Sequence, residues 1–419
     1  MNEVSVSRIP LLPQAKTFRN KTELARHFLL QALSHITVGY VTIHDGEDTH
    51  HFGNSEDTRE PHAEIVIHNR AAFAKVLLGG TVAAGEAYID GDWSTPDLTE
   101  VTRLFSANMQ AMESVESKQH WYTKLALKIA HTMNRNTHEG SKRNISAHYD
   151  LGNDFFRLFL DPTMMYSAAV FDRRENTLEK AAVGKLDELC RQLDLKPDDH
   201  LLEIGTGWGG MAIHAATHYG CHVTTTTISQ EQFDYAKARV TELGLEDRIT
   251  LLCEDYRALT GQYDKLVSVE MIEAVGHDFY SSYFQCCSKL LKNDGKMVIQ
   301  AITITDDRYE QARRSVDYIK RYIFPGGCLP SLEIIAKHIA KDSDLQMVHL
   351  RDITADYALT LAHWRQRFMA RLEEVREMGF DDRFIRMWEF YLCYCEGGFR
   401  ERIIGTAQIA FAKPGYRSV

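Results

Sequence analysis

The sequence predicts an α/β protein in which a large domain with a doubly wound sheet follows a smaller α+β domain. The chain has 419 residues, more than one compact domain usually holds. From residue 200 onward, apolar strand patterns alternate with helical patterns, as is typical of a doubly wound sheet. Residues 36–69 instead contain short alternating strands broken by turn-rich sequence, which indicates a separate small domain.

The elements of the large domain follow from their hydrophobic periods. Strands are expected at 201–204, 223–227, 249–252, 265–269 and 297–302, and helices from about residue 209, at 230–243 and at 279–291. An insertion at 304–343 comes next. A strand near 347–350, two long helices at 358–376 and 383–395, and a terminal strand at 407–412 follow it. The terminal strand is expected to pair antiparallel with the sheet.

The small domain is predicted to occupy residues 1–110, with strands at 36–43 and 64–67 and a helix at 71–78. Residues 111–145 then form a basic amphipathic linker, in which Lys124 and Lys128 alternate with apolar and aromatic side chains. This linker is suited to anionic lipid, although a solvated interdomain helix would show the same pattern. The large domain takes residues 146–419.

Bulk composition narrows the class of protein. A net charge of −10 argues against nucleic acid as a partner. The sequence predicts neither a signal peptide nor an apolar run of the roughly 18 residues that span a bilayer, and the eight scattered cysteines fit reduced cytoplasmic thiols. His214 and His218 lie one helical turn apart, but the glutamate of a His-Glu-x-x-His site is missing, so no metal is predicted.

A glycine-rich loop follows the first predicted strand of the large domain. Gly205-Thr-Gly-Trp-Gly-Gly210 fits G-x-G-x-x-G, a bare backbone turn that lets a cofactor approach a helix N-terminus. That spacing would also suit a nicotinamide dinucleotide. However, the next strand ends in a run of threonines, without the acid that binds a dinucleotide ribose. With Glu203 two residues before the first glycine, the loop resembles the first motif of Rossmann-like methyltransferases.

A longer resemblance covers most of the chain. Residues 146–172 are similar to the block that precedes the methyltransferase fold in the cyclopropane fatty acid synthase family, and residues 85–93 resemble the N-terminal domain of the two-domain bacterial synthases. Further matching segments are 227–232, 254–257, 269–277, 322–330, 356–364 and 397–400. The resemblance implies a Rossmann-like class I methyltransferase domain with S-adenosyl-L-methionine as the methyl donor.

The resemblance also implies which residues bind the donor. Carried over by motif, these are Tyr166, Ser167, Gly205, Gly207, Thr227, Ile228, Gln232, Asp255 and Tyr256. Tyr166 and Ser167 are expected to touch the donor, and the two glycines to line it. Thr227, Ile228 and Gln232 are assigned to its ribose or methionyl part, and Asp255 with Tyr256 to the adenine. Taken singly, Thr227 could simply end a strand and Asp255 could begin a turn.

The implied reaction joins a sulfonium methyl group to the cis double bond of an unsaturated fatty acyl chain. Because positive charge develops on carbon, an apolar tunnel with aromatic faces is expected. Candidates for these faces are Tyr166, Phe171, Tyr322, Phe324, Tyr357 and Trp364, any of which could equally be core residues.

In the resembled synthases, a bound bicarbonate ion is thought to accept the proton that is lost at ring closure. Glu273, the backbone around Ile302, and Tyr357 match the positions that hold it, but Ala168 replaces a cysteine and Gln300 replaces a histidine. These replacements predict weaker anion binding. Glu273 could instead act directly as a base, stabilise the cation, or belong to a structural network.

Three functions therefore stay open. The first is cyclopropane formation on unsaturated phospholipids, with Gln300 donating to the anion and Tyr357 completing the site. The second is a methyl-branched or methylene-bearing unsaturated product, favoured by the replacements at Ala168 and Gln300. The third is a non-catalytic lipid-binding protein. The expected location is the cytoplasm, peripheral to the inner face of the cytoplasmic membrane, and the N-terminal domain could form a homodimer.

Overall fold

The computed structural model describes residues 21–56, 59–109, 151–173 and 176–417. The predicted basic linker, 111–145, and the first residues of the 146–172 block lie outside these ranges. The chain divides into two compact units, of which the first takes residues 1–140 together with 381–390 and the second takes the remainder. The assignment of 381–390 to the first unit was not predicted.

The first unit is built on a four-stranded sheet in the order β2-β1-β3-β4. Its elements are α1 (Lys21–Leu33), β1 (Tyr40–Asp45), β2 (Asp48–Gly53), β3 (His62–Ile67), α2 (Ala71–Ile89), β4 (Trp93–Ser94) and α3 (Leu98–Ala107). The parallel neighbours β1 and β3 bury Val41, Ile43, Ala63 and Ile65. The strand predicted at 36–43 starts only at Tyr40, because residues up to Ile36 close a turn onto the end of α1.

Helix α2 is longer than the predicted 71–78. It continues through a kink at Gly80, where φ is 58° and only glycine is comfortable. By length and composition alone, α2 is the one described helix that reaches the apolarity of a membrane span, with a mean hydropathy of 1.2. Its later turns bury Ala87 and Tyr88, and Ala84 accepts a hydrogen bond from the Trp93 indole at 3.0 Å. These contacts are those of a helix packed within the small unit.

The second unit contains a seven-stranded sheet in the order β10-β11-β9-β8-β5-β6-β7. The strands are β5 (His200–Ile204), β6 (His222–Thr227), β7 (Ile249–Cys253), β8 (Tyr263–Val269), β9 (Leu291–Ile304), β10 (Gln346–Asp352) and β11 (Ile404–Ala412). The strands β5 to β9 pair in parallel, whereas β11 pairs antiparallel with both β9 and β10. The doubly wound α/β fold with an antiparallel terminal strand is therefore confirmed.

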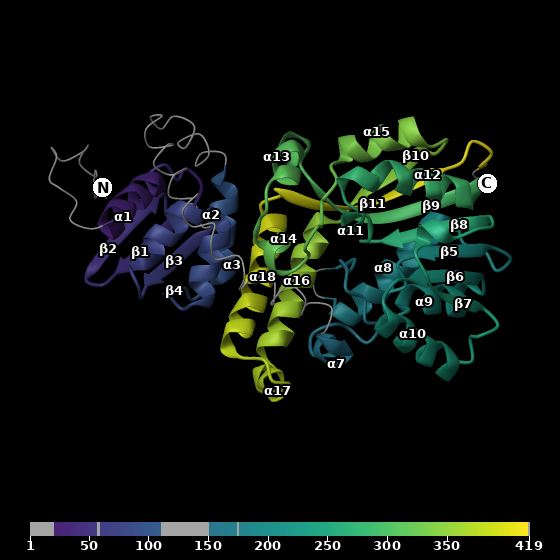
Figure 1. The fold of residues 1–419 in the computed structure, drawn as a ribbon, viewed down its shortest axis with the longest axis horizontal. Helices are drawn as coiled ribbons and strands as arrows, with labels where there is room; N and C mark the ends of the chain where they lie inside the picture. The colour runs from purple at the N-terminus through teal and green to yellow at the C-terminus, as the bar shows by residue number, and fades with distance from the viewer. Residues whose placement is uncertain (1–20, 57–58, 110–150, 174–175, 418–419) are drawn as a thin grey trace. The chain divides into compact units, whose positions relative to one another are not determined.

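Helices cover both faces of this sheet (Figure 1). On one face pack α8 (Leu178–Leu193), α9 (Gly210–Tyr219) and α10 (Gln230–Glu242), and on the other α12 (Tyr280–Leu290) and α15 (Leu332–Asp342). Each layer has its own buried apolar cluster, because both faces of a mainly parallel sheet must be shielded from water. This arrangement leaves the carboxyl ends of β5 to β9 as the edge at which loops gather.

The remaining described helical segments complete the chain. They are α7 (Gly152–Arg157), η3 (Tyr256–Ala258), α11 (Ile272–Val275), η4 (His277–Phe279), η5 (Asp306–Arg308), α13 (Tyr309–Arg314), α14 (Tyr318–Tyr322), α16 (Thr354–Met369), α17 (Leu372–Glu377) and α18 (Asp382–Arg400). The helix predicted at 358–376 is in fact two, because Arg371 leaves helical geometry between α16 and α17. Helix α16 also starts earlier than predicted, where Asp352 accepts a hydrogen bond from the Thr354 amide.

Candidate active site

The glycine loop joins β5 to α9 through backbone conformations that residues with a Cβ rarely adopt. Gly205 has φ of 100° and Gly207 has φ of 52°, and the Gly205 and Thr206 amides donate to the Thr226 carbonyl of β6 at 3.1 and 3.0 Å. Apart from its chain neighbours, no atom of the described residues lies within 4 Å of the place that a Cβ would take on Gly207. The loop therefore offers an open stretch of backbone at the carboxyl end of β5, which fits the predicted donor.

The next two strands carry the predicted ribose and adenine residues. Thr227 ends β6, and its hydroxyl donates to the Gln232 side-chain oxygen at 3.0 Å. Ile228 is 81% exposed. One strand further, Asp255 caps η3, and its carboxylate pairs with Arg257 at 2.6 Å. Tyr256 is half-buried against the Tyr283 ring. The structure thus brings these residues to adjacent strand ends at one edge of the sheet.

A buried charged network lies beneath the loop, and one member of it was not predicted. Lys185 of α8 is fully buried and donates to the Ser167 hydroxyl at 2.8 Å. Burial lowers the pKa of Lys185 to about 8, opposed by the charges of Glu270, Asp161 and Glu203. Burial also raises the pKa of Glu203 to about 8, opposed by a 2.6 Å hydrogen bond from Thr225 and by Lys185. Ser167 is therefore positioned by a buried amine.

Glu270 is the residue at the centre of the site that the sequence analysis did not single out. It follows β8 directly, with φ of 49°. Its Oε1 accepts hydrogen bonds from the Ala168 amide and the Gln300 side chain, both at 2.8 Å. Its Oε2 accepts from the Tyr357 hydroxyl at 2.8 Å. Three of the predicted catalytic residues therefore meet on this one carboxylate.

Glu273 stands one helical turn further along the chain, in α11. Its Oε1 accepts a short 2.5 Å hydrogen bond from the Ile302 amide, whereas its Oε2 is buried and has no hydrogen-bond partner within the described part of the chain. Burial and the nearby charge of Glu270 raise the pKa of Glu273 to about 8. At neutral pH Glu273 is therefore mainly the neutral acid.

Aromatic side chains form the wall beside these two acids. The Tyr166 ring lies 5.3 Å from Trp364 and 6.3 Å from Phe324 between ring centres, and its hydroxyl shares a 2.8 Å hydrogen bond with Tyr391. Trp364 in turn lies 6.2 Å from Tyr357. The other two predicted wall residues pack elsewhere: Phe171 stacks on His363, and Tyr322 packs on Tyr318.

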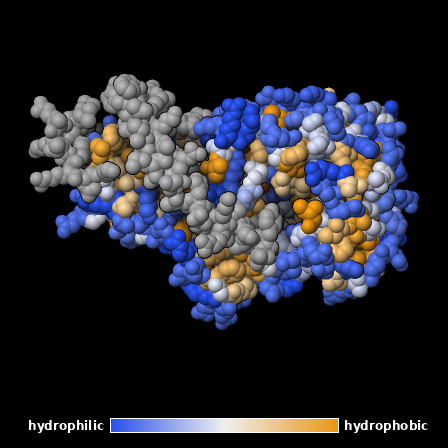
Figure 2. Space-filling view, viewed as in Figure 1, coloured by the Kyte–Doolittle hydropathy of each residue, from blue (hydrophilic) through white to orange (hydrophobic). Residues whose placement is uncertain are grey.

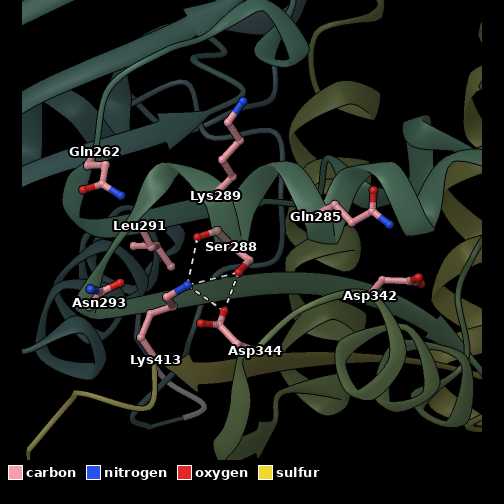
Figure 3. Close-up of a pocket in the computed structure, with 9 residues that line it drawn as sticks. All are labelled: Gln262, Gln285, Ser288, Lys289, Leu291, Asn293, Asp342, Asp344 and Lys413. Carbon is pink, nitrogen blue, oxygen red and sulfur yellow. Dashed lines mark hydrogen bonds and ion pairs between the residues drawn. The ribbon is translucent and has the colours of Figure 1, made fainter.

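A surface pocket elsewhere in the second unit is separate from this site (Figure 3). It lies where β9 begins, and its lining includes Leu291, Asn293 and Lys413. The Lys413 amine points into the pocket wall, where it donates to Ser288 and pairs with Asp344 at 2.6 Å. Because this cation is already paired and the catalytic candidates sit at the opposite ends of the strands, we do not assign the pocket to the active site.

Comparison with known proteins agrees with this geometry. The family profile for mycolic acid cyclopropane synthetase matches residues 136–409. The tuberculostearic acid methyltransferase UfaA1 of Mycobacterium tuberculosis is 35% identical over 98% of this chain and 95% of its own length. The cyclopropane-fatty-acyl-phospholipid synthase of Escherichia coli K12 is 36% identical over 84% of this chain and 88% of its own.

Solved structures show the same similarity. The mycolic acid cyclopropane synthase CmaA1, complexed with SAH and CTAB, matches with a TM-score of 0.60 and 30% identity, over 65% of this chain and 98% of that one. Fold, glycine cradle and relatives together define an S-adenosylmethionine-dependent methyltransferase. More particularly, the chain belongs to the mycolic acid cyclopropane synthetase family. Its activity is the transfer of a methyl or methylene carbon to lipid chains.

Proposed function

We propose that this enzyme methylates the cis double bond of unsaturated acyl chains in membrane phospholipids. The observation that carries the proposal is the meeting of a buried carboxylate, Glu270, with an aromatic wall at the same strand ends as the glycine cradle. An alkene is a weak nucleophile, so the site must align it with the methyl group and stabilise a carbon cation. The E. coli relative is named for a phospholipid acyl substrate, which supports this choice.

Different residues of the site bind the donor, stabilise the cation and exclude water. The backbone of Gly205 and Gly207 would hold the donor, which supplies an electrophilic methyl group when bound. The faces of Tyr166 and Trp364 attract positive charge without capturing it, since neither side chain offers a free anion. Glu270 adds a negative charge close to the same wall through its bond to Tyr357. Close aromatic packing keeps water, a competing nucleophile, away from the cation.

Two products are consistent with this arrangement. In the first, the added methyl group loses a proton and closes a cyclopropane ring, as the name of the E. coli relative indicates for that enzyme. In the second, a neighbouring carbon loses the proton and a methyl-branched alkene results, or a hydride first shifts from the methyl-bearing carbon to the cation and the methyl group then loses the proton, which gives a methylene-bearing chain. The M. tuberculosis relative, which matches nearly the whole chain, is named a tuberculostearic acid methyltransferase and not a cyclopropane synthase, and this favours the second product.

The two products are separated by incubating the full-length enzyme with donor and vesicles of monounsaturated phospholipid, then recording the proton NMR spectrum of the extracted lipid. We expect a new one-carbon substituent at the former double bond. Cyclopropyl protons would exclude the second product, and a retained alkene with a branched methyl group would exclude the first. Unchanged lipid after complete incubation would contradict the proposed function itself.

Access to a phospholipid acyl chain requires docking at the membrane surface, which we assign to the segment 309–324. This segment carries Val316, 64% exposed, and the basic residues Arg313 and Arg314, which share one acid, Glu310, so that positive charge is left in excess. It also supplies Phe324, whose ring approaches Tyr166, so it lies beside the site. Figure 2 shows hydrophobic residues exposed in patches among hydrophilic ones on the visible face of the second unit. Apolar and cationic groups together favour anionic lipid.

Val316→Asp is expected to weaken binding to anionic phospholipid vesicles by on the order of tenfold, because an apolar contact is lost and a like charge is added. Vesicle sedimentation measures the effect. The matched control is Leu243→Asp, at the end of α10, where an apolar side chain is 52% exposed outside this segment. Equal loss of binding in both variants would contradict the assignment.

A further inference from the structure

The resemblance to cyclopropane synthases implies a bicarbonate ion at this site, yet the residues present do not fit one. The positions expected to hold the ion include Ala168, Gln300 and Tyr357. The donors at all three point to Glu270 at 2.8 Å. The Ile302 amide, the remaining donor of the expected set, is bonded to Glu273. A second anion would find no free donor among them and would be repelled by the Glu270 carboxylate.

We infer that Glu270 is the enzyme's own proton acceptor and takes the place of bicarbonate. This inference rests on the proposed function. A carboxylate offers about four acceptor positions, of which the three described donors use three. The remaining position, on Oε2, is available for a proton. The carboxylate thus has the charge and the hydrogen-bond partners of a bound anion, but it belongs to the chain and cannot dissociate.

A relay of buried amides fixes the direction of the Gln300 donor. Gln192 donates to the Gln408 oxygen at 2.7 Å, and Gln408 donates to the Gln300 oxygen at 3.0 Å. The Gln300 amino group is therefore left to donate to Glu270 and to the Ala168 carbonyl at 3.1 Å. Gln300 and Gln408 are completely buried. A buried hydrogen-bond network of this kind holds the Gln300 amide in one orientation, with its amino group toward Glu270.

The charge states of the two acids agree with this role. Burial raises the pKa of Glu270, whereas the hydrogen bonds from Gln300, Ala168 and Tyr357 and the charge of Lys185 oppose that rise. Glu273 has only one donor and a raised pKa of about 8. Three donors stabilise the charged form of Glu270 and only one stabilises that of Glu273, so hydrogen bonding favours Glu270 as the charged member of the pair.

Methyl transfer and proton loss take place in sequence. The alkene electron pair forms the carbon–carbon bond to the methyl group as the carbon–sulfur bond breaks, and sulfur keeps the pair of the broken bond. A proton then passes from the added methyl group, or from the carbon next to the cation, to Glu270 Oε2. The electron pair of that carbon–hydrogen bond becomes the ring bond or the new double bond. Glu270 returns to its charged form by releasing the proton to water.

The decisive variant is Glu270→Gly. Glycine is favoured at φ of 49°, so the variant is expected to fold, and its three donors are left open. In buffer freed of carbon dioxide, the methyl-transfer rate should fall by on the order of a hundredfold or more. Added bicarbonate or formate should restore much of it. Glu270→Gln should lose the same activity without rescue, because its side-chain amide occupies the space among the three donors.

The wild-type rate should be the same with and without bicarbonate. Asp194→Gly is the matched control, since Asp194 is an exposed acid with φ of 54° at the end of α8. This control should keep the wild-type rate. Stimulation of the wild type by bicarbonate, or an undiminished rate in Glu270→Gly without it, would overturn the inference.

Calorimetry measures formate binding to the three donors around position 270 independently of any turnover. We expect binding to Glu270→Gly and none to the wild type or to Asp194→Gly. Formate binding to the wild type, or its absence in a folded Glu270→Gly, would contradict the claim that the Glu270 carboxylate occupies an anion site. If the wild type transfers no methyl group, the proposed function fails, and the binding comparison still decides whether Glu270 occupies an anion site.

Discussion

Gly205→Ala is expected to raise the Kd for S-adenosylmethionine by on the order of tenfold or more. Gly205 has φ of 100°, a conformation that costs a residue with a Cβ roughly 1–3 kcal/mol. The added methyl group would also lie 3.4 Å from the Met271 side chain. Relief of the backbone strain moves the loop that lines the donor, and about 1.4 kcal/mol corresponds to a tenfold change in affinity. Isothermal titration calorimetry measures it.

Gly261→Ala is the control for backbone strain alone. Gly261 has φ of 95°, lies before β8 at the opposite end of the sheet, and has open space around its Cβ position. It should lose a similar amount of stability while keeping the wild-type Kd. If both variants bind the donor as the wild type does, Gly205 does not line the donor.

Phe155→Ala is expected to destabilise the second unit by about 3–5 kcal/mol, the usual cost of truncating a buried phenylalanine. Phe155 is completely buried, and four aromatic rings surround it. Their centres lie between 5.3 and 6.1 Å away, on Phe156, Phe159, Phe368 and Phe380. Because α7 anchors the segment leading to Tyr166, the cavity should loosen the aromatic wall as well. Denaturant unfolding followed by fluorescence measures the change.

The matched truncation is Phe279→Ala, at a phenylalanine that is 51% exposed. This control should lose well under half of the stability lost by Phe155→Ala, since little apolar area leaves the core. Equal losses in the two variants would show that the aromatic cluster around Phe155 is not a principal source of stability.

The sequence predicted the large sheet because its strands are buried on both faces and alternate strongly with helices. The elements that the sequence did not predict are those whose local patterns are weak. The strand β2 is short, polar and rich in histidine, so its pattern does not differ from that of a loop. Helix α2 continues through Gly79 and Gly80, where two glycines normally predict an end. In both cases tertiary contacts decide the structure.

The candidate site shows a similar division. The motif resemblance identified Ala168 and Gln300 as departures from the synthase pattern and predicted weaker anion binding. It did not identify Glu270, although this acid lies three residues before Glu273, because the compensation appears only when four separate segments come together in space. Lys185 gave no signal, since a lysine within a helical pattern is ordinarily solvated.

The central claim is the transfer of a methyl group from S-adenosylmethionine to the double bond of a membrane lipid. The most direct test incubates the full-length enzyme and methyl-labelled donor with two sets of vesicles that share a headgroup, one with cis-monounsaturated and one with fully saturated acyl chains. We predict label in the acyl chains of the unsaturated lipid alone. Equal labelling of both lipids, or no labelling of either, would contradict the claim.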